Sequence, residues 1–313
     1  MERIDRTELA GVRTERRVME TDVDEIDLIP VRTYWQLVRQ RFLNHRLAVA
    51  ALLMLLALIA LAVIIPTVTG NASQKTSQAL INKPPSLVAP FGYDSIGQNI
   101  FIRLMKGLQT SLVVGFAAVV IIAVIGVSIG AVAGYVGGMV DNLLMRFVDI
   151  VLSLPSFFLI VTMVAFFGTG NAWVVIFAIG LTGWTLATRL VRAEFLSLRE
   201  ADFVQAARAL GAGDRRIMVR HMLPSALAPV VVAATLGIAD SVVVEAALSF
   251  LGFGISPPEA SLGNMLTNAK DYFFRAPILV YYPGVTIILV VLAASFLGDG
   301  LRDALDPRQR IEK

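Results

Sequence analysis

The sequence predicts an all-α membrane protein with six transmembrane helices and both termini in the cytoplasm. Three observations lead to this fold class: 56% of the 313 residues are hydrophobic, only 16% are charged, and the apolar residues gather in six long segments. A soluble domain carries about 25% charged residues, so this composition is typical of a chain embedded in a bilayer. Each apolar segment is close to the length, about 20 residues, that a helix needs to cross the hydrocarbon core.

The composition also excludes several kinds of site. The chain contains no cysteine, so disulfides, cysteine-ligated metals and a cysteine nucleophile are ruled out. Its two histidines, His45 and His221, are too few for a multi-histidine metal centre, and no HExxH motif is present. We therefore predict no catalytic residue and no metal ligand. The net charge of +3 is interpreted through membrane topology rather than nucleic-acid binding.

Residues 1–46 are predicted to form a cytoplasmic leader ahead of the first span. The polar residues 1–30 are expected to be largely mobile. Residues 33–46 alternate apolar and basic side chains at helical spacing, which favours a helix in the lipid headgroup layer over one packed against the rest of the protein. The first span, residues 47–65, carries no charge and ends before Pro66. Its distance from the start of the chain indicates a retained signal anchor rather than a cleaved signal peptide.

The second predicted span covers residues 111–136 and the third covers residues 143–167. Glycines recur at every fourth position in the second span, at Gly126, Gly130 and Gly134. This spacing either allows another helix to approach closely or reflects the ordinary frequency of glycine in membrane helices. Pro155 lies inside the third span, and a proline at that place predicts a kinked helix.

The remaining predicted spans are residues 172–191, 225–247 and 282–297. Seven arginines lie in residues 189–221, whereas the longer loops 67–110 and 248–281 contain few basic residues. Cytoplasmic loops of membrane proteins are enriched in lysine and arginine. The sequence therefore places both termini and residues 189–221 in the cytoplasm, and the two long loops outside.

Residues 198–222 are predicted to fold as an elbow of two short helices joined by a glycine turn. The first helix carries an apolar stripe at helical spacing, formed by Phe203, Ala206 or Ala207, and Leu210. Gly211 and Gly213 end the first helix, and Asp214 caps the second. Pro224 marks the start of the fifth span. Such an elbow suits the transmission of force from a soluble partner to the membrane helices, although a helical loop kept inside by its positive charge has the same pattern.

Within this elbow the sequence resembles the EAA loop found in membrane subunits of bacterial ABC importers. The pattern here is QAA-x3-G-x9-HMLP, which starts at Gln205, has Gly211 near its centre and ends at Pro224. The family pattern is usually written EAA-x3-G-x9-I-x-LP. This chain departs from it at Gln205 and His221, and both departures leave the elbow pattern intact.

Four further stretches are similar to the peptide-transport branch of that family. They are FGYDSIGQNIFIRLMKGLQTSL at 91–112, DNLLMRFVDIVLSLPSFFL at 141–159, EAALSFLGFGISPPEASLGNML at 245–266 and GDGLRDALDPRQR at 298–310. In the first stretch, Gln98 and Asn99 replace the usual Arg-Asp pair. The resemblance covers residues 33–313 and implies the C-type permease subunit of a dipeptide, oligopeptide or nickel importer. It also implies the type I ABC importer permease fold over residues 47–313.

The resemblance implies that the elbow is a coupling helix that inserts into a cytoplasmic ATPase. The residues that it assigns to this contact are Gln205, Ala206, Ala207, Leu210, Gly211, Ala212, Asp214 and Arg215. The chain has no GxxxxGK[ST] phosphate-binding loop, so it is predicted not to be an enzyme and to bind no cofactor itself. ATP and Mg²⁺ are expected to be used by the partner ATPases.

The same resemblance implies a protein of the bacterial cytoplasmic (inner) membrane with several partners. They are a second homologous permease subunit in a heterodimer, two cytoplasmic ATPase subunits or domains, an extracytoplasmic substrate-binding protein, membrane lipid and a peptide substrate. The binding protein is expected to dock on loops 67–110 and 248–281. No nucleic acid is expected.

Two acidic residues in the fifth span, Asp240 and Glu245, are candidates for the substrate path. An ionisable residue inside the membrane marks a functional site by default, and a carboxylate suits the free amine of a peptide. Glu245, near the predicted outer end, would equally fit a position facing water or a neighbouring subunit. The alternatives to a peptide importer are an importer of nickel or another small solute, and a secondary transporter, for which no inverted repeat is found.

Overall fold

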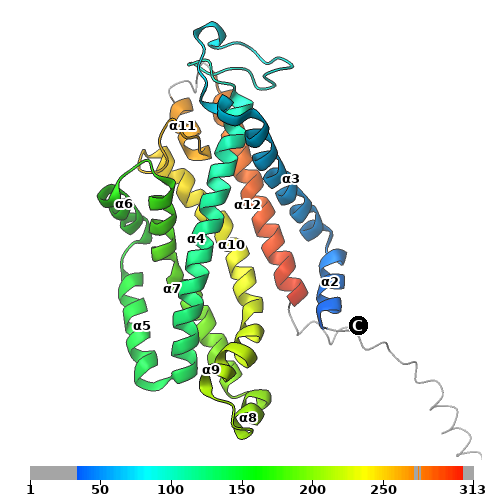
Figure 1. Cartoon of the computed structure of the whole chain (residues 1–313), viewed down its shortest axis with the longest axis vertical. Helices are drawn as coiled ribbons and strands as arrows, with labels where there is room; N and C mark the ends of the chain where they lie inside the picture. The colour runs from blue at the N-terminus through cyan, green and yellow to red at the C-terminus, as the bar shows by residue number, and fades with distance from the viewer. Residues whose placement is uncertain (1–33, 271–273, 275, 306–313) are drawn as a thin grey trace, which may run out of the picture.

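The computed structural model describes residues 34–270, 274 and 276–305, which form a bundle of long helices (Figure 1). Five helices are long and apolar enough to cross a membrane: α3 (Arg46–Thr69), α4 (Ile100–Val136), α7 (Ala172–Arg199), α10 (Leu223–Phe250) and α12 (Ile278–Leu305). The pair α5 (Gly138–Ser153) and α6 (Ser156–Phe167) supplies a sixth when it is counted as one span. The predicted all-α fold is confirmed, because the described residues contain no strand.

The helices run beyond the apolar segments from which they were predicted. α3 continues through Pro66, which the sequence predicted to end it. A proline this close to a helix end removes only one hydrogen bond. α4 begins at Ile100, well before the predicted start, because the Asn99 side chain accepts hydrogen bonds from the N–H groups of Phe101 and Ile102. Hydropathy indicates where lipid surrounds a helix, whereas capping decides where the helix begins.

Pro155 divides the third predicted span into two helices. Leu154 has an extended backbone (φ −93°, ψ 133°), and α5 and α6 are bent by 82° relative to each other. Proline has no N–H to donate and disfavours a helical conformation in the residue before it. The predicted kink is thus confirmed, and it is large enough to make α6 a separate helix at a steep angle to α5 (Figure 1).

The glycine stripe of α4 lies against α7. A Cβ atom added at Gly126 would lie 2.6 Å from the Cβ of Ala187, and one added at Gly130 would lie 2.6 Å from the carbonyl oxygen of Thr188. A Cβ at Gly134 would collide with α7 in the same way. Because these separations are well inside van der Waals contact, only glycine permits the observed spacing of the two helices. The interpretation of this spacing as a close helix contact is confirmed.

Ser128 lies between Gly126 and Gly130 and gives this stretch a G-x-S-x-G spacing. In hydrolases that spacing marks a nucleophile on a sharp turn from a strand to a helix. Here the serine lies in the middle of α4, and its hydroxyl donates to the carbonyl oxygen of Val124 at 2.6 Å. The spacing therefore has no catalytic meaning in this chain.

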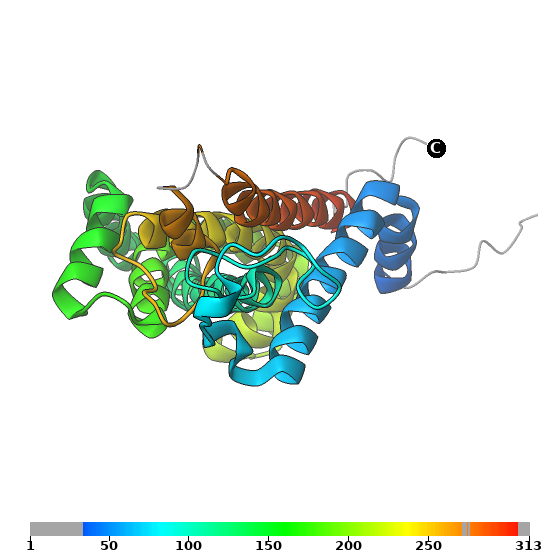
Figure 2. The same cartoon turned by 90° about the horizontal axis from the view of Figure 1, so that it is seen from above.

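The two ends of the bundle differ in structure (Figures 1 and 2). One end carries the short helices η1 (Gly70–Gln74), η2 (Gln78–Leu80) and α11 (Leu262–Lys270). The opposite end carries the elbow, formed by α8 (Asp202–Ala209), α9 (Asp214–Arg216) and the π-helical segment η3 (Ile217–Met222). Between these ends, α4, α7 and α10 occupy the centre, with α3 and α12 on one side and α5 and α6 on the other.

The helix expected within residues 33–46 is present as α2 (Tyr34–Asn44). Phe42 packs on the apolar cluster between α3 and α12, whereas Trp35 is 70% exposed. The helix thus packs on the bundle with one side and leaves an aromatic side chain exposed on the other, and its place in the lipid headgroup layer stays a prediction. His45 follows α2 and caps α3, where its Nδ1 accepts from the Ala48 N–H at 3.1 Å. Residues 1–33 of the predicted leader lie outside the described residues.

Candidate functional site

The turn inside the elbow is built by Gly211. Its φ of +80° is a conformation that glycine adopts freely and other residues rarely adopt. The Gly211 N–H donates to the carbonyl oxygen of Arg208, and the Ala212 N–H donates to that of Ala207, both at 3.0 Å. This pair of bonds is a Schellman motif, which satisfies carbonyl groups at the end of α8. The predicted glycine-terminated helix is therefore confirmed.

The sequence predicted that the second half of the elbow is a separate short helix, and this prediction is wrong. α9, η3 and α10 form one continuous helical rod, Asp214–Phe250, that passes through Pro224. The Leu223 N–H donates to the carbonyl oxygen of Met218, five residues back, which is the hydrogen bond of a π-helix. This wider turn lies directly before Pro224, which has no N–H to offer, so the chain continues as a helix despite the proline.

Asp214 does not cap this helix, which corrects another prediction. Gly213 is the capping residue and makes no side-chain bond there. Asp214 lies in the first turn, and its Oδ1 accepts a hydrogen bond from the Tyr135 hydroxyl at 2.6 Å. Because Tyr135 is at the end of α4, this bond ties the elbow to a different transmembrane helix.

The elbow has a buried inner face and an exposed outer face. Val204, Ile217 and Met222 are fully buried and pack with residues of α4, α7 and α10. In contrast, Phe203 is 43% exposed and Leu210 is 88% exposed. The apolar stripe predicted from the sequence thus points away from the bundle, where it is free to contact another protein.

The residues assigned to ATPase contact are all brought together in this elbow. Gln205, Ala206, Leu210, Gly211, Asp214 and Arg215 are exposed, whereas Ala207 and Ala212 are half-buried. The Gln205 amide donates to the carbonyl oxygen of Arg199 at 3.4 Å, so this departure from the family pattern makes a local contact within the elbow region. Ala206 and Gly211, the two small exposed residues of this set, allow a partner to approach the backbone closely at their positions.

Two ion pairs, which the sequence did not reveal, connect α5 to α7 next to the elbow. Arg192 binds both carboxylate oxygens of Asp141, with its Nη2 2.6 Å from Oδ2. Arg189 binds Asp149 at 2.6 Å, but both of these side chains are about half exposed. A two-pronged, largely buried pair holds helices together more firmly than an exposed pair. An apolar pattern along α5 does not indicate which arginines of α7 these two acids face.

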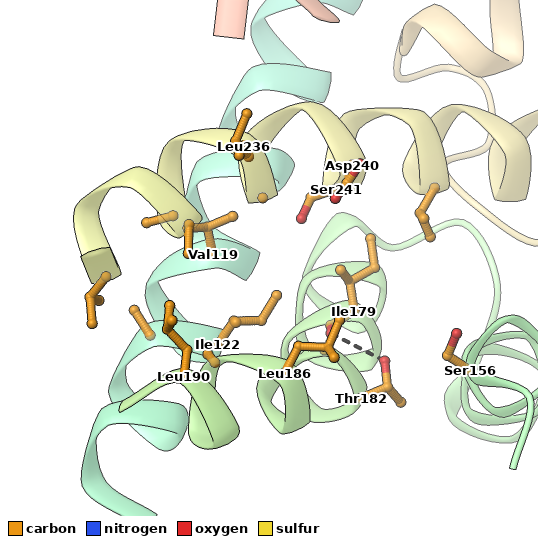
Figure 3. A pocket seen from close by; sticks show the side chains of 18 of the residues that line it. Val119, Ile122, Ser156, Ile179, Thr182, Leu186, Leu190, Leu236, Asp240 and Ser241 are labelled. Carbon is orange, nitrogen blue, oxygen red and sulfur yellow. Dashed lines mark hydrogen bonds between the residues drawn. The ribbon is translucent and has the colours of Figure 1, made fainter. Parts of the chain in front are cut away.

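A cavity of about 430 Å³ lies between α4, α6, α7 and α10 (Figure 3). Its walls are mostly apolar, with Val119, Ile179 and Leu186 among them. The polar side chains along it are Ser156, Thr182, Asp240 and Ser241. Among the described residues that line this cavity, Asp240 alone carries a charge. The structure thus places this predicted path residue at the wall of an open space between the helices.

Glu245, the second predicted path residue, lies elsewhere. It has no exposed surface and does not line the cavity. Its Oε2 accepts from the Ser111 hydroxyl at 2.6 Å, and its Oε1 accepts from the Ser249 hydroxyl at 2.7 Å. Five residues turn an α-helix by about 500°, so Asp240 and Glu245 are about 140° apart around α10. The sequence placed both acids in one span but did not show that they face different surroundings.

This arrangement defines a multi-pass helical membrane protein with an exposed elbow at one end and a cavity between its helices. Residues 126–311 match the family described as "Binding-protein-dependent transport system inner membrane component", and the chain belongs to this family. Residues 33–85 match a second family, described as "N-terminal TM domain of oligopeptide transport permease C". The predicted family resemblance is thereby confirmed.

Proteins that are similar along almost their whole length carry peptide-transport names. The dipeptide transport system permease protein DppC of Alkalihalophilus pseudofirmus is 38% identical over 278 residues, which cover 88% of this chain and 90% of that protein. The glutathione transport system permease protein GsiD of Pectobacterium atrosepticum is 38% identical over 282 residues, covering 89% and 92%.

A solved structure shows the same fold. An inward-facing conformation of the MetNI methionine ABC transporter superposes with a TM-score of 0.53 at 24% sequence identity. The match covers 65% of this chain and 96% of the chain in that structure. The predicted fold of an ABC importer permease is therefore confirmed.

Proposed function

We propose that this chain is the membrane-spanning permease subunit of an ATP-driven importer of dipeptides or oligopeptides. The observation that carries the proposal is the elbow, whose outer face is exposed while its inner face is packed on three transmembrane helices. The names of the relatives that are 38% identical over most of the chain support peptides as the substrate class.

In this proposal the outer face of the elbow docks in a groove of a cytoplasmic ATPase subunit. ATP and Mg²⁺ are held by two such subunits, and this chain contributes no catalytic residue. Movement of the ATPases displaces the elbow. Because Asp214–Phe250 is one continuous helical rod, a displacement at Asp214 is passed directly to the part of α10 that carries Asp240. The Tyr135–Asp214 bond and the Arg192–Asp141 pair pass the same displacement to α4 and α5.

The distribution of arginine supports an orientation with the elbow and both termini in the cytoplasm of a bacterium. The end that carries η1, η2 and α11 then faces outward and, with loops 67–110 and 248–281, receives a substrate-binding protein. A second homologous permease completes the membrane part as a heterodimer. The exposed apolar side chains along α5 and α6, such as Phe158 and Phe166, provide a surface for lipid or for that subunit.

The cavity beside Asp240 is the proposed part of the translocation path in this subunit. Its volume of about 430 Å³ falls within the roughly 300–1,000 Å³ typical of small-ligand sites. Mostly apolar walls tolerate varied side chains, and one carboxylate attracts the amine that peptides share. Alternating access would expose this space first to one side of the membrane and then to the other.

Disruption of the exposed face of the elbow tests this function. We expect Leu210→Asp to release the ATPase subunits during purification of the assembled importer and to abolish ATP-dependent uptake of dialanine in proteoliposomes. The replacement leaves the fold intact because Leu210 is 88% exposed. Leu87→Asp is the matched control, since Leu87 is an equally exposed leucine at the opposite end. It should retain the ATPases. Normal ATPase retention and uptake with Leu210→Asp would contradict the assignment of the elbow.

A further inference from the structure

Glu245 joins two transmembrane helices through both of its carboxylate oxygens. Ser111 of α4 donates to one oxygen at 2.6 Å, and Ser249 of α10 donates to the other at 2.7 Å. All three side chains are buried. Hydrogen bonds to a buried carboxylate are strong, because the low surrounding polarity does not weaken them.

The same two serines also bind the backbone of residues 255–262, which follow α10. The Ile255 N–H donates to the Ser249 hydroxyl at 3.0 Å, and the Leu262 N–H donates to the Ser111 hydroxyl at 3.2 Å. Each hydroxyl therefore accepts from the backbone and donates to Glu245. Two chains of hydrogen bonds, one from each end of the 255–262 segment, meet at a single carboxylate.

Asn264, which follows the 255–262 segment, holds the segment by hydrogen bonds to its backbone. Its Nδ2 donates to the carbonyl oxygens of Ile255 and Glu259, at 3.2 and 2.7 Å, and its Oδ1 accepts from the Ser261 N–H at 3.1 Å. A Cβ atom added at Gly263 would collide with the backbone of α10 at Ala246, so the segment is pressed directly on that helix. These contacts leave little freedom for residues 255–262.

Only the tip of the segment is open to a partner. Pro257, Pro258 and Glu259 are exposed, whereas Ile255 and Ala260 are each 2% exposed. The tip lies at the end of the bundle that carries α11, opposite the elbow (Figure 1). An exposed, rigid tip on a buried polar base is the form expected of a recognition loop, because its conformation is settled before the partner arrives.

We propose that Glu245 is a positioning residue that holds residues 255–262 in the conformation that docks the substrate-binding protein. This inference rests on the proposed function, which places this end of the bundle outside. The partner is the binding protein that the family description names, and it meets two prolines and one carboxylate at the tip. Removing Glu245 leaves two buried hydroxyls without an acceptor, so Ser111 and Ser249 lose the contact that orients them toward the N–H groups of Leu262 and Ile255, and the segment loses its fixed form.

The mobility of the tip provides a test that does not depend on transport. The chain has no cysteine, so Glu259→Cys creates the one thiol of this subunit for a nitroxide spin label, in an importer whose partner subunits have had any reactive cysteines replaced. We expect an immobile label in this background. Adding Glu245→Ala, Ser111→Ala or Ser249→Ala should give a mobile component in the spectrum. Each serine variant removes only one of the two chains, so the test remains decisive if Glu245→Ala does not fold.

The matched control is Ser128→Ala, because Ser128 lies on α4 like Ser111 but bonds only to its own helix. This variant should leave the label immobile. In proteoliposomes without the label, the KM for binding protein loaded with dialanine, measured by stimulated ATPase activity, should rise at least about fivefold in Ser111→Ala and Ser249→Ala. The maximal stimulated rate should change by less than about twofold.

An immobile label in every variant would overturn the anchoring role of Glu245. A mobile label with an unchanged KM would overturn the link to docking. If binding protein fails to stimulate even the unaltered complex, the proposed function fails with it, while the spectra still report whether Glu245 holds the segment.

Discussion

Asp240 and Glu245 show how position around one helix separates two acidic residues. Asp240 reaches the cavity among apolar walls, whereas Glu245 is enclosed by the hydroxyls of Ser111 and Ser249. A carboxylate that borders an apolar cavity inside a membrane span attracts a cation, because the apolar walls lower the local polarity. A carboxylate with hydrogen bonds on both oxygens is instead suited to holding structure. The two residues therefore call for different tests.

For Asp240 we expect the Asp240→Asn variant to lower maximal uptake of dialanine about tenfold, because the ammonium group loses its counter-charge in the cavity. Uptake of N-acetyl-dialanine, which has no ammonium group, should change less than about twofold. Transport into proteoliposomes at saturating binding protein measures both. Asp299→Asn, at an exposed acid on α12 away from the cavity, is the control. An equal loss for both substrates would contradict a role in recognising the amine.

At the scale of elements, the spacing between helices depends on a few glycines. α4 and α7 approach so closely that a Cβ at Gly130 would lie 2.6 Å from a backbone carbonyl oxygen of α7. Gly284 in α12 has nothing within 4 Å of the same added atom. Both are helical glycines in apolar spans, yet only one of them is required by its neighbours.

We therefore expect Gly130→Ala to destabilise the subunit by about 1–3 kcal/mol, because the two backbones must separate. Gly284→Ala should be neutral or stabilising by up to about 1 kcal/mol, since alanine is the better helix former and meets open space. The midpoint of thermal unfolding of the purified subunit in detergent compares the two. Equal unfolding midpoints for the two variants would show that α4 and α7 can separate to accommodate the added methyl group without loss of stability.

At the scale of the whole molecule, each end of the bundle carries an exposed leucine, and the two leucines are proposed to lie on opposite sides of the membrane. Leu210 projects from the elbow and is 88% exposed, whereas Leu87 projects from the opposite end and is fully exposed. Neither is covered by another part of the described chain. The proposed orientation places Leu210 inside the cell and Leu87 outside.

Single cysteines test this orientation directly, because the natural chain has none. We expect a membrane-impermeant maleimide added to intact cells to label Leu87→Cys and not Leu210→Cys. In inverted membrane vesicles the pattern should reverse. Labelling of Leu210→Cys from outside would contradict the cytoplasmic placement of the elbow and, with it, the proposed contact with an ATPase.

Much of the fold was predictable because hydropathy, glycine spacing and proline act locally. The apolar segments located the spans, the spacing of Gly126, Gly130 and Gly134 offered a close helix contact as one of two interpretations, and Pro155 predicted a kink where α5 and α6 meet. Helix limits were less predictable. Asn99 starts α4 earlier than its hydropathy indicates, and a π-turn carries the chain through Pro224. Both depend on one or two hydrogen bonds that an apolar pattern does not record.

The sequence by itself determined the class of this protein, the presence of an elbow between the fourth and fifth spans, and the residues that form it. Only the tertiary structure decided which way each side chain faces. Asp214, a predicted cap, instead accepts a hydrogen bond from Tyr135, and Glu245, a candidate for the substrate path, is buried and accepts a hydrogen bond from Ser111. The physical reason is that helix formation depends on residues close together in the chain. The surroundings of a side chain, in contrast, depend on helices such as α4 and α10 that meet only after folding.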